Sequence, residues 1–396
     1  MTAGTPQAVA WPILPGATLG VLGGGQLGRM FVHAAQALGY ATAVLDPDPG
    51  SPAGRISHHH VRAAYDDAQG LAELARRCAA VTTEFENVPA AALEQLARAL
   101  PVSPAGACVA IAQDRAAEKA RFVRSGAPVA PHAVIACEAD LAAADPALLP
   151  GILKTTRLGY DGKGQVRVAT APELAAAWQQ LGRVPCVLEQ LLPLAQECSV
   201  IVARGAGGAL VHLPVQRNLH RDGILTVTEV FEGNLPEAIA TQALYAAKNI
   251  ARDLDYVGVL CVEFFVLEDG RLVINEMAPR PHNSGHWSQN GADVSQFELQ
   301  VRCMTGLPLA QPRQHSAAVM LNLLGDLWFD EGAQSAPRAP AWDRVLALPG
   351  CHLHLYGKAE PKRGRKMGHL NVTAASAGAA RATALQAAAV LGIAPF

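Results

Sequence analysis

Two glutamates, Glu263 and Glu276, lie in two strand-like runs on either side of an Asp-Gly pair at residues 269–270. An Asp-Gly pair between two such runs is a strong signal for a two-residue hairpin turn. That turn pairs residues whose numbers sum to 539, so Phe264 faces Asn275 and Glu263 faces Glu276. The hairpin therefore predicts two carboxylates side by side on neighbouring strands.

Two facing carboxylates among apolar neighbours need a shared proton or a cation, because like charges about 5 Å apart destabilise a sheet. Mg²⁺ suits this pair, since it binds one or two carboxylates together with phosphate oxygens. Asn275 offers an adjacent amide that could assist. The alternative is that one glutamate points to solvent at a sheet edge, which would leave no metal site.

The segment LKTTRLGYDGKGQ, residues 153–165, also carries binding chemistry. Its three glycines and Lys163 form a loop whose backbone N–H groups and ammonium could cover phosphates, while Lys154 on the preceding strand offers a fixed cation. The segment lacks the G-x-x-x-x-G-K-[ST] spacing of a Walker A loop. A glycine-rich hairpin tip without a ligand is the alternative interpretation.

Two further polar segments follow the paired glutamates. APRPHNSGHWSQ, residues 278–289, contains Arg280 and His286, which could bind a small anion or a phosphoryl group in transfer. Residues 357–369 contain five cations between positions 358 and 366, which as a group could hold a monophosphate. The alternatives are a capped turn before the next helix and a solvated basic loop.

Near the N-terminus, Gly23, Gly25 and Gly28 show G-x-G-x-x-G spacing after an apolar run, and Asp46 ends the next apolar run. This arrangement is typical of dinucleotide-binding folds, in which such an acid binds a ribose. A dehydrogenase is therefore one interpretation of this region. The dehydrogenase interpretation gives no role to the paired glutamates or to the glycine-rich loop.

Strands and helices are expected to alternate at the start of the chain. TEFENVP, residues 83–89, follows a strand, and its glutamates Glu84 and Glu86 share one face if it is extended, or mark only a strand end. We expect a βαβαβ unit. Its strands are 18–22, 41–46 and 80–83, and its helices are 27–38, 70–78 and 89–99.

A helix over 113–131, stopped by Gly126 and Pro128, is expected to lead into a smaller β-rich region at about 130–195 that holds a helix at 172–181. A mixed region follows to about residue 330, and a short β-like tail precedes a final helix. Within the mixed region we expect strands 197–204, 209–216, 224–231, 258–267 and 272–277, and helices 236–254 and 294–305.

Composition excludes several classes of protein. The 396 residues suffice for two or three domains, and 50% hydrophobic with 17% charged residues is typical of a soluble enzyme. A net charge of −2 gives no long-range attraction to nucleic acid, and eight cysteines without a C-x-x-C pair indicate no zinc knuckle. Neither a signal peptide nor a run of about 20 apolar residues is present. We expect a cytoplasmic protein without nucleic-acid or membrane partners.

A glycine-rich loop with an upstream lysine, followed by two metal-type carboxylates on late strands, resembles the ATP-grasp superfamily. Finer motifs are similar to those of 5-(carboxyamino)imidazole ribonucleotide synthases: GGGQLGRM, TEFENVP, QDR…EK, GYDGKGQ, ECSVIVAR, NEMAPRPHNSGHW and SQFE. The resemblance covers residues 17–390 in order. The formate-dependent glycinamide ribonucleotide transformylases share the GGGxLG start, but APRPHNSGHW argues against them.

The resemblance implies an α/β fold of the ATP-grasp type in three domains. These are a Rossmann-like pre-ATP-grasp domain at 18–117, a small central lid domain at 118–195, and a mixed C-terminal domain with a small β tail at 196–396. Residues 1–17 form an extension that we expect to be disordered.

The same resemblance implies that ATP binds between the central and C-terminal domains. The positions matching nucleotide-binding residues are Arg115, Lys154, Gly159, Tyr160, Asp161, Gly162, Lys163, Gly164, Gln165, Glu189, Gln190, Leu191, Leu192, Glu197, His220, Asn275 and Glu276. Those matching ligands of Mg²⁺, with Mn²⁺ as an alternative ion, are Glu263 and Glu276. Those assigned to the ribonucleotide pocket are Gly25, Gln26, Leu27, Glu84, Tyr160, Asp161, Arg280, Lys358 and Arg365.

The implied reaction has two steps. Bicarbonate attacks the γ-phosphate of ATP to give carboxyphosphate, and the 5-amino nitrogen of aminoimidazole ribonucleotide then takes the carboxyl group. Lys154, Arg280 and Mg²⁺ would stabilise charge on the phosphoryl group, with His286 as a candidate for anion contact or proton handling. The resemblance also implies a homodimer whose product passes to a separate mutase. A non-catalytic protein that binds ATP without turnover is a further alternative.

Overall fold

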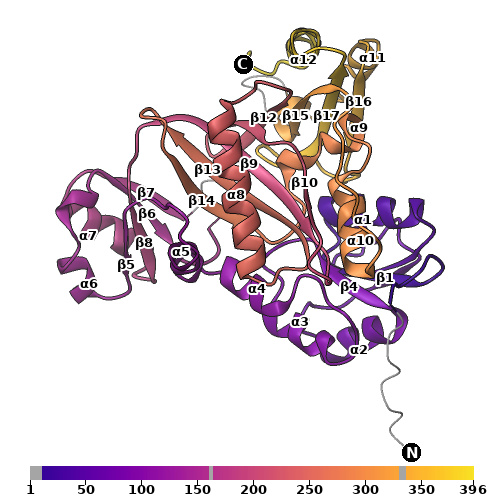
Figure 1. Cartoon of the computed structure of the whole chain (residues 1–396), viewed down its shortest axis with the longest axis horizontal. Coiled ribbons are helices and arrows are strands. Elements are labelled where there is room, and N and C mark those ends of the chain that lie inside the picture. The colour runs from indigo at the N-terminus through magenta and orange to yellow at the C-terminus, as the bar shows by residue number, and fades with distance from the viewer. Residues whose placement is uncertain (1–10, 160–163, 330–335) are drawn as a thin grey trace, which may run out of the picture.

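The computed structural model describes residues 11–159, 164–329 and 336–396. Within these residues the chain forms three β-sheets with helices packed on their faces (Figure 1). The first sheet belongs to the N-terminal part, the second projects to one side, and the third runs from the centre into the C-terminal part. The glycine turn, the lysine-bearing strand and the paired glutamates therefore come from three different sheets.

The first sheet is parallel, in the order β3-β2-β1-β4, and contains the expected βαβαβ unit. Its core strands are apolar almost throughout because helices cover a parallel sheet on both faces. Since β1 and β4 are neighbours, their carboxyl ends bring the glycine turn next to TEFENVP. The elements are β1 (Thr18–Leu22), α1 (Gln26–Ala37), β2 (Ala41–Leu45), β3 (His59–Val61), α2 (Ala68–Arg77), β4 (Ala80–Thr83), α3 (Ala90–Ala97) and α4 (Gly106–Ala112).

The second sheet is antiparallel, in the order β5-β8-β6-β7. The helix expected over 113–131 is shorter, because the chain turns at Gly126 with a φ of 70°, a backbone conformation suited to glycine. The elements are α5 (Arg115–Arg124), β5 (His132–Ile135), α6 (Glu138–Ala142), a 3₁₀ turn (Pro146–Leu148), β6 (Gly151–Thr155), β7 (Gln165–Val168), α7 (Ala171–Gln180) and β8 (Cys186–Gln190).

The third sheet is antiparallel, in the order β14-β13-β9-β11-β12-β15-β17-β16, with β10 paired to β9. The strand expected at 209–216 is wrong as one element, because it splits around Pro214, which has no N–H to donate; β15 was not expected. The strands are β9 (Leu194–Arg204), β10 (Leu210–His212), β11 (Gln216–Arg221), β12 (Ile224–Val230), β13 (Gly258–Leu267), β14 (Leu272–Ala278), β15 (Ala317–Leu324), β16 (Cys351–Leu355) and β17 (Lys366–Ala374).

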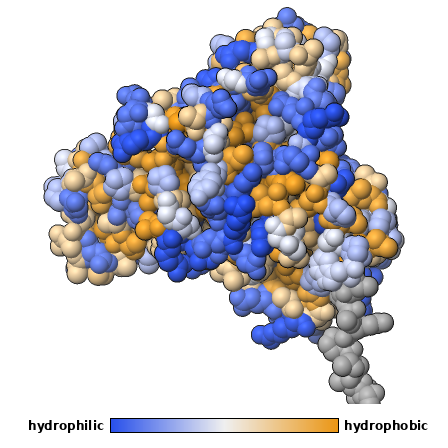
Figure 2. All heavy atoms as spheres, in the orientation of Figure 1, coloured by the Kyte–Doolittle hydropathy of each residue, from blue (hydrophilic) through white to orange (hydrophobic). Residues whose placement is uncertain are grey.

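Helices cover both faces of the central strands. The apolar side of α8 (Glu237–Asp253), including Ile239 and Ala243, packs on β9 and β13, while hydrophilic residues cover much of its outward side (Figure 2). From the other face, α10 (Gln296–Thr305) contributes Leu299 to the sheet core and Met304 to the core of the first sheet. Helix α10 therefore joins the first and third sheets. Among the described helices, none is long and apolar enough to cross a membrane.

The C-terminal part adds smaller helices to the third sheet. The last of these helices packs alanines against β15 and β17, as its Ala-rich sequence allows. The elements are a 3₁₀ turn (Asn283–Gly285), α9 (Ser288–Gly291), a 3₁₀ turn (Gly325–Trp328), α11 (Trp342–Leu346) and α12 (Ala377–Leu391).

The expectation of disorder over residues 1–17 is wrong for the part that the structure describes. Ile13 is buried, its N–H donates to the carbonyl of Thr305 (2.8 Å), and its own carbonyl accepts from the Tyr40 hydroxyl (2.7 Å). The apolar side chain and these two hydrogen bonds hold the segment against α10. Residues 1–10 lie outside the described residues.

Candidate active site

Two adjoining cavities lie where the three sheets meet. The larger, about 460 Å³, is open between the second and third sheets. Its lining includes Arg115, Lys154, Gln165, Glu189, Gln190, Leu191, Leu192, Glu197, His220, Asn275 and Glu276. The structure therefore gathers eleven of the predicted nucleotide-binding residues around one space.

The smaller cavity, about 160 Å³, extends toward the first sheet. Gly159 and Arg280 line it, whereas Gly164 instead accepts a hydrogen bond from the N–H of Thr155 (2.9 Å). Tyr160, Asp161, Gly162 and Lys163 lie outside the described residues. The residues that line both cavities are Arg115, Gly223, His220, Glu263 and Glu276.

The hairpin of β13 and β14 pairs Glu263 with Glu276, as expected, but not for the expected reason. The turn is longer than two residues, since the N–H of Leu267 donates to the carbonyl of Arg271. Phe264 therefore faces Ile274, and the predicted pairing of Phe264 with Asn275 is wrong. Asn275 forms a β-bulge that restores the register at the glutamates.

Each glutamate of the pair has a nitrogen partner close by. Oε1 of Glu263 lies 2.9 Å from Nε2 of His282, and Oε2 of Glu276 accepts from Nη1 of Arg115 at 2.8 Å. Burial alone would raise the pKa of Glu263, but His282 and His220 lower it to about 2. The carboxylate oxygens of this pair fit Mg²⁺ or Mn²⁺. The buried Oδ1 of Asn275, which has no hydrogen-bond partner among the described residues, is a third suitable donor beside them.

A buried chain of charges connects the second sheet with this hairpin. Oε1 of Glu189 lies 3.2 Å from Nζ of Lys154, and its Oε2 lies 3.1 Å from Nζ of Lys119. Nζ of Lys119 also donates to the carbonyl of Asn275 at 3.2 Å. Burial opposes ionisation of Glu189, yet the two lysines lower its pKa overall. Lys119, on α5, therefore contacts both the lid-side strand β8 and the bulge of β14.

Glu118, the neighbour of Lys119, is also buried, and its Oε1 accepts from the N–H of Met277 at 2.7 Å. Burial first, and then the charge of Glu276, raise the pKa of Glu118 to about 8. Site prediction did not include either residue. The signal was present, because both belong to the QDR…EK motif.

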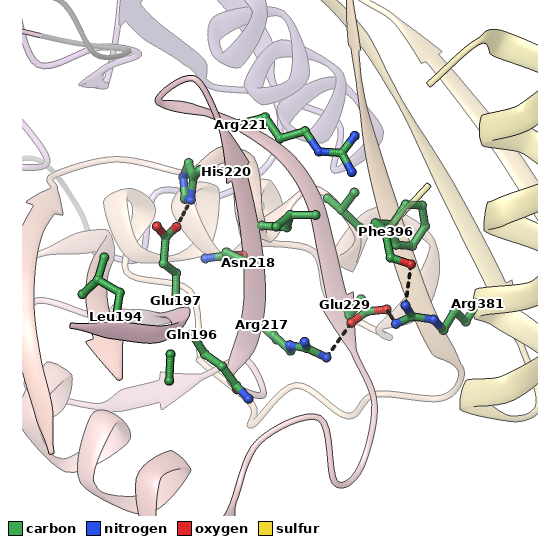
Figure 3. Close-up of a pocket in the computed structure, with 13 residues that line it drawn as sticks. Leu194, Gln196, Glu197, Arg217, Asn218, His220, Arg221, Glu229, Arg381 and Phe396 are labelled. Atoms are coloured by element: carbon green, nitrogen blue, oxygen red, sulfur yellow. Dashed lines mark hydrogen bonds and ion pairs between the residues drawn. The ribbon is translucent and has the colours of Figure 1, made fainter. Parts of the chain in front are cut away.

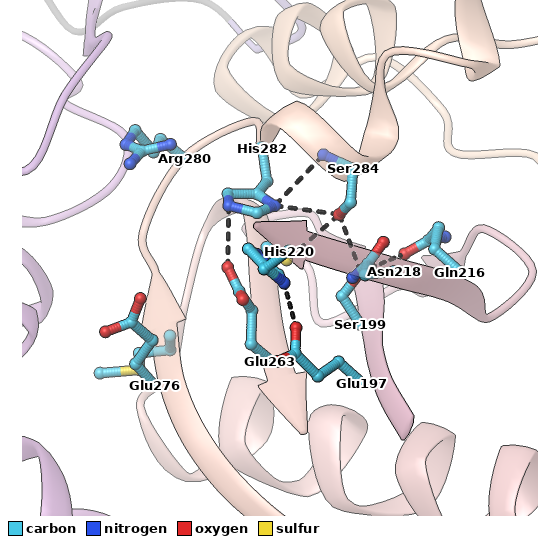
Figure 4. A network of polar contacts seen from close by, with 12 residues as sticks. Glu197, Ser199, Gln216, Asn218, His220, Glu263, Glu276, Arg280, His282 and Ser284 are labelled. Carbon is cyan, nitrogen blue, oxygen red and sulfur yellow. Dashed lines mark hydrogen bonds and ion pairs between the residues drawn. The ribbon is translucent and has the colours of Figure 1, made fainter. Parts of the chain in front are cut away.

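His220 and Glu197 come from the neighbouring strands β11 and β9, and Nδ1 of His220 hydrogen-bonds to Oε2 of Glu197. Burial lowers the pKa of His220, but this hydrogen bond and nearby glutamates raise it overall. Figure 4 shows this pair beside Glu263 and His282. The predicted nucleotide-binding residues Glu197 and His220 therefore lie next to the pair of Glu263 and Glu276.

The glycine turn after β1 is occupied by a side chain of this chain. The carboxylate of Glu84 accepts from the N–H groups of Gly25 (2.6 Å) and Gly28 (2.8 Å) at the start of α1. A Cβ added to Gly25 would lie 2.3 Å from Oε1 of Glu84, so a larger residue there would displace this carboxylate. Asp46 instead accepts from the N–H of Gly24 at 2.6 Å. Gly25 and Glu84 are brought together, as the predicted ribonucleotide pocket requires.

Arg280 is held by the first sheet. Its Nε lies 2.5 Å from Oε2 of Glu86, which follows β4. Burial would raise the pKa of Glu86, but the Arg280 guanidinium lowers it to about 2. Both glutamates of TEFENVP are therefore used: Glu84 caps the glycine turn and Glu86 positions Arg280. Site prediction chose only Glu84.

The other predicted ribonucleotide residues fall into two groups. Nζ of Lys358 donates to Oε1 of Gln26 at 2.8 Å. This bond joins the basic segment, residues 357–369, to α1. The side chain of Leu27 is buried among apolar neighbours, so only its backbone is available to a ligand. Arg365 donates to the carbonyl of Glu360 at 3.0 Å, and it is the next residue, Lys366, that lines the smaller cavity.

The prediction that His286 contacts an anion is wrong. Its side chain is fully buried, accepts at Nδ1 from Nε2 of Gln296 (3.0 Å), and lies 4.6 Å from His369 between ring centroids. Burial lowers the pKa of His286 well below its usual value. Because of the 3₁₀ turn between them, the side chains of His282 and His286 point in different directions, and it is His282 that lines the cavity. Spacing alone could not distinguish the two histidines.

A third cavity, about 510 Å³, is lined by residues of β9, β11 and β12 and by the last residue of the chain (Figure 3). Leu194, Glu197 and His220 also line the 460 Å³ cavity. Its arginines Arg217 and Arg381 both pair with Glu229, at 3.1 and 2.6 Å. Arg221 donates to the carbonyls of Ala394 and Pro395, at 3.0 and 2.6 Å. These arginines are paired with groups of the chain itself, and of the predicted site residues only Glu197 and His220 line this cavity.

A small sheet that faces paired carboxylates across an open cavity, here about 460 Å³, is the arrangement of ATP-grasp proteins. Residues 120–297 match the ATP-grasp domain, and residues 16–113 match the ribonucleotide synthetase preATP-grasp domain. The chain is therefore an ATP-grasp protein. It is 45% identical over 363 residues to the N5-carboxyaminoimidazole ribonucleotide synthase of Brucella melitensis, covering 90% of this chain and 96% of that protein. The chain belongs to the N5-carboxyaminoimidazole ribonucleotide synthase family.

Further similarities agree with this membership. Residues 318–383 match the phosphoribosylaminoimidazole carboxylase C-terminal domain. The structure of Staphylococcus aureus N5-carboxyaminoimidazole synthetase with ADP superposes with a TM-score of 0.86 at 34% identity, covering 97% of this chain and 100% of that one. That of the Aspergillus clavatus synthase with ADP and 5-aminoimidazole ribonucleotide gives 0.85 at 31% identity, covering 95% and 98%. The expected fold and family are confirmed, and the dehydrogenase interpretation is wrong.

Proposed function

We propose that the chain catalyses the ATP- and bicarbonate-dependent carboxylation of 5-aminoimidazole ribonucleotide at its 5-amino nitrogen. The products are N5-carboxyaminoimidazole ribonucleotide, ADP and phosphate, in de novo purine biosynthesis. Family membership supports this reaction, together with relatives solved with ADP and with the aminoimidazole ribonucleotide.

One observation carries the proposal: the two cavities share Arg115, His220, Glu263 and Glu276. The larger cavity would hold ATP, and the smaller one, which reaches Arg280 and Glu86, would hold bicarbonate next to the ribonucleotide. A phosphoryl group leaving ATP would therefore reach bicarbonate across the shared residues. The amine would then approach from the side of the first sheet.

The bond changes follow from this order. A bicarbonate oxygen bonds to the γ-phosphorus as the bond to ADP breaks, which gives carboxyphosphate. The 5-amino nitrogen then bonds to the carboxyl carbon of carboxyphosphate. The bond between that carbon and the phosphate oxygen breaks in the same step. Catalysis of such a transfer is chiefly positioning and charge stabilisation. Lys154 would bind phosphate oxygens on the ATP side, and Arg280 would bind the transferring anion.

The metal ligands proposed are Glu263 and Glu276, with Oδ1 of Asn275 beside them. When bound there, Mg²⁺ or Mn²⁺ would neutralise charge on the phosphates. Arg115 and His282 contact the two carboxylates, so they are placed to contact phosphate once the carboxylates hold a cation. Carboxylates from adjacent strands are suitable because Mg²⁺ prefers few protein oxygens and several from phosphate or water.

The ribonucleotide would bind across the glycine turn and the basic segment. The contact of Lys358 with Gln26 supports this placement, because it holds a cation beside the start of α1, where anions are favoured. Gly25 and Glu84 would contact the substrate from the same side. We further propose domain limits of 18–117, 118–195 and 196–396, a cytoplasmic homodimer, and transfer of the product to a separate mutase.

The test is ADP release in bicarbonate with and without 5-aminoimidazole ribonucleotide. The proposal predicts stimulation by this substrate, and none by glycinamide ribonucleotide with formate, the substrates of the related transformylase. Lack of stimulation by the aminoimidazole substrate would overturn the proposal. ATP binding without ADP release under every condition would indicate a non-catalytic nucleotide-binding protein.

A further inference from the structure

Cys261 stands beside the glutamate pair and has no part in the proposed reaction. It lies two residues before Glu263 on β13, so both side chains project from the same face of the strand. His282 approaches that face from the segment after β14. One ligand atom from each of these three residues lies within 4.8 Å of the others.

The donor set differs in chemistry from the glutamate pair. A sulfur, an imidazole nitrogen and one carboxylate oxygen form a typical ligand set for Zn²⁺ and other thiophilic cations, whereas Mg²⁺ prefers oxygen alone. A thiolate and a carboxylate together would balance the charge of a divalent cation. The cluster therefore favours a soft metal over the ion of the proposed reaction.

The surroundings also suit a bound cation. Oγ of Ser284 lies 2.9 Å from Nδ1 of His282 and 4.0 Å from Sγ of Cys261. The backbone N–H of Ser284 also donates to Nδ1 at 3.3 Å, so this ring nitrogen is held by two contacts while Nε2 faces Glu263. A hydrogen-bonded partner at the second ring nitrogen is the usual support of a metal-binding histidine. Ser284 is itself fixed by Oγ of Ser199 at 2.8 Å (Figure 4). The orientation of His282 is therefore set before any cation binds.

Access to the cluster is from the smaller cavity. Glu263 and His282 line that cavity, and each side chain is 13% exposed, whereas Cys261 is buried beneath them. Burial raises the pKa of the Cys261 thiol well above its usual value, so a bound cation must displace the thiol proton. A cation would enter past the carboxylate and meet the sulfur last.

We propose that Cys261, Glu263 and His282 form a binding site for a thiophilic divalent cation such as Zn²⁺ or Cd²⁺. Because Glu263 would belong to both ligand sets, this cation and Mg²⁺ with ATP would exclude each other. The site itself does not depend on the proposed function, and only its effect on nucleotide binding rests on the shared carboxylate.

The test uses Co²⁺ as a spectroscopic probe of the nucleotide-free, tag-free full chain. The proposal predicts one thiolate-to-Co²⁺ charge-transfer band per chain, lost in Cys261→Ser. The matched control is Cys108→Ser, another buried cysteine, whose Sγ donates to the carbonyl of Leu254 at 3.5 Å, a bond that a serine hydroxyl can keep. The control must retain the band. A band absent from the natural chain, or unchanged in Cys261→Ser, would overturn the proposal.

Two measurements need no variant and so do not depend on whether Cys261→Ser folds. X-ray absorption of the zinc-loaded natural chain should show one sulfur at about 2.3 Å with nitrogen and oxygen neighbours. Only nitrogen and oxygen neighbours would contradict the site. Mg²⁺ with ATP should weaken Co²⁺ binding at least tenfold, and unchanged Co²⁺ affinity would refute the sharing of Glu263. None of these measurements requires turnover, so a failed carboxylation assay would leave them interpretable.

Discussion

Nε of Arg280 lies 2.5 Å from Oε2 of Glu86, across 194 positions of the chain. The first sheet thus orients the guanidinium of Arg280, which follows the β13–β14 hairpin of the third sheet. Through this ion pair, the part of the chain that would bind the ribonucleotide also positions a group that would stabilise the transferring anion.

Glu86→Gln keeps the shape of the side chain and removes its charge. We expect kcat to fall at least tenfold with KM for ATP within about threefold, because Arg280 would lose its orientation while the larger cavity is unchanged. Steady-state ADP release measures both constants. A normal kcat, or a loss confined to KM for ATP, would show that Glu86 does not act through Arg280.

The same variant should change acid stability. The pKa of Glu86 is lowered in the fold to about 2 from the ordinary 4.5, so its stabilisation is complete above pH 4.5 and is lost as pH falls from there toward 2. The stability difference between natural chain and variant should therefore shrink over that range. Urea unfolding at pH 6 and pH 3 checks this; a difference that is equal at both values would contradict it.

Glu276→Gln should reduce turnover at least a hundredfold while the fold is retained, because one anionic ligand of the proposed metal pair is removed. The matched control is Glu268→Gln, an exposed glutamate at the tip of the same hairpin, which should retain normal activity. ADP release and circular dichroism of both variants provide the comparison. Near-normal ADP release by Glu276→Gln would make the metal assignment wrong.

Lys119→Met should raise KM for ATP at least tenfold. Nζ of Lys119 contacts both Glu189 and the carbonyl of Asn275, so its loss would loosen β8 relative to the metal-type hairpin. Removing one partner of a buried ion pair typically costs about 3 to 5 kcal/mol, although Lys154 still pairs with Glu189 here. Lys119→Arg should recover part of the affinity. Unchanged KM and unfolding free energy in Lys119→Met would exclude this positioning role.

A stack of buried histidines predicts a further pH effect. Burial lowers the pKa values of His286 and His369 well below 6.5, and that of His354 to about 4. These rings are neutral in the fold, whereas the unfolded chain takes up protons below pH 6.5. The contribution of these three rings to the free energy of unfolding should therefore be constant above about pH 7 and fall below 6.5, by about 1.4 kcal/mol per pH unit for each proton taken up.

Urea unfolding between pH 7.5 and 5.5 measures that slope. His369→Gln should reduce it by about one proton, because Gln does not titrate and can still accept from the hydroxyl of Tyr356, which lies 3.0 Å from Nδ1 of His369. The matched control is His315→Gln, an exposed histidine, which should leave the slope unchanged. An equal slope in His369→Gln and the natural chain would show that the stack carries no acid sensitivity.

Local patterns predicted the elements well and their contacts less well. The pairing of Glu263 with Glu276 is correct because two errors cancel: the turn is longer than the Asp-Gly signal indicates, and the bulge at Asn275 restores the register. A turn motif describes a few residues, whereas the bulge is held by Lys119 from a distant helix. The sequence of the hairpin alone carries no information about such long-range contacts.

The glycine turn and the histidines show the same limit. G-x-G-x-x-G spacing predicted a strand, a tight turn and a helix start correctly, but its N–H groups meet Glu84 of the neighbouring strand's end rather than a dinucleotide. His286 and His282 are equally suitable by residue type. Only the direction of the intervening 3₁₀ turn decides that His282 lines the cavity while His286 is buried.

In the proposed reaction, bicarbonate attacks the γ-phosphate of ATP before the carboxyl group reaches the amine. Turnover of ¹⁸O-labelled bicarbonate with ATP and 5-aminoimidazole ribonucleotide, followed by mass analysis of the phosphate, tests it directly. We expect one bicarbonate oxygen in each phosphate released and one ADP per carboxylated product. Phosphate without the label, formed at the same rate as carboxylated product, would contradict it.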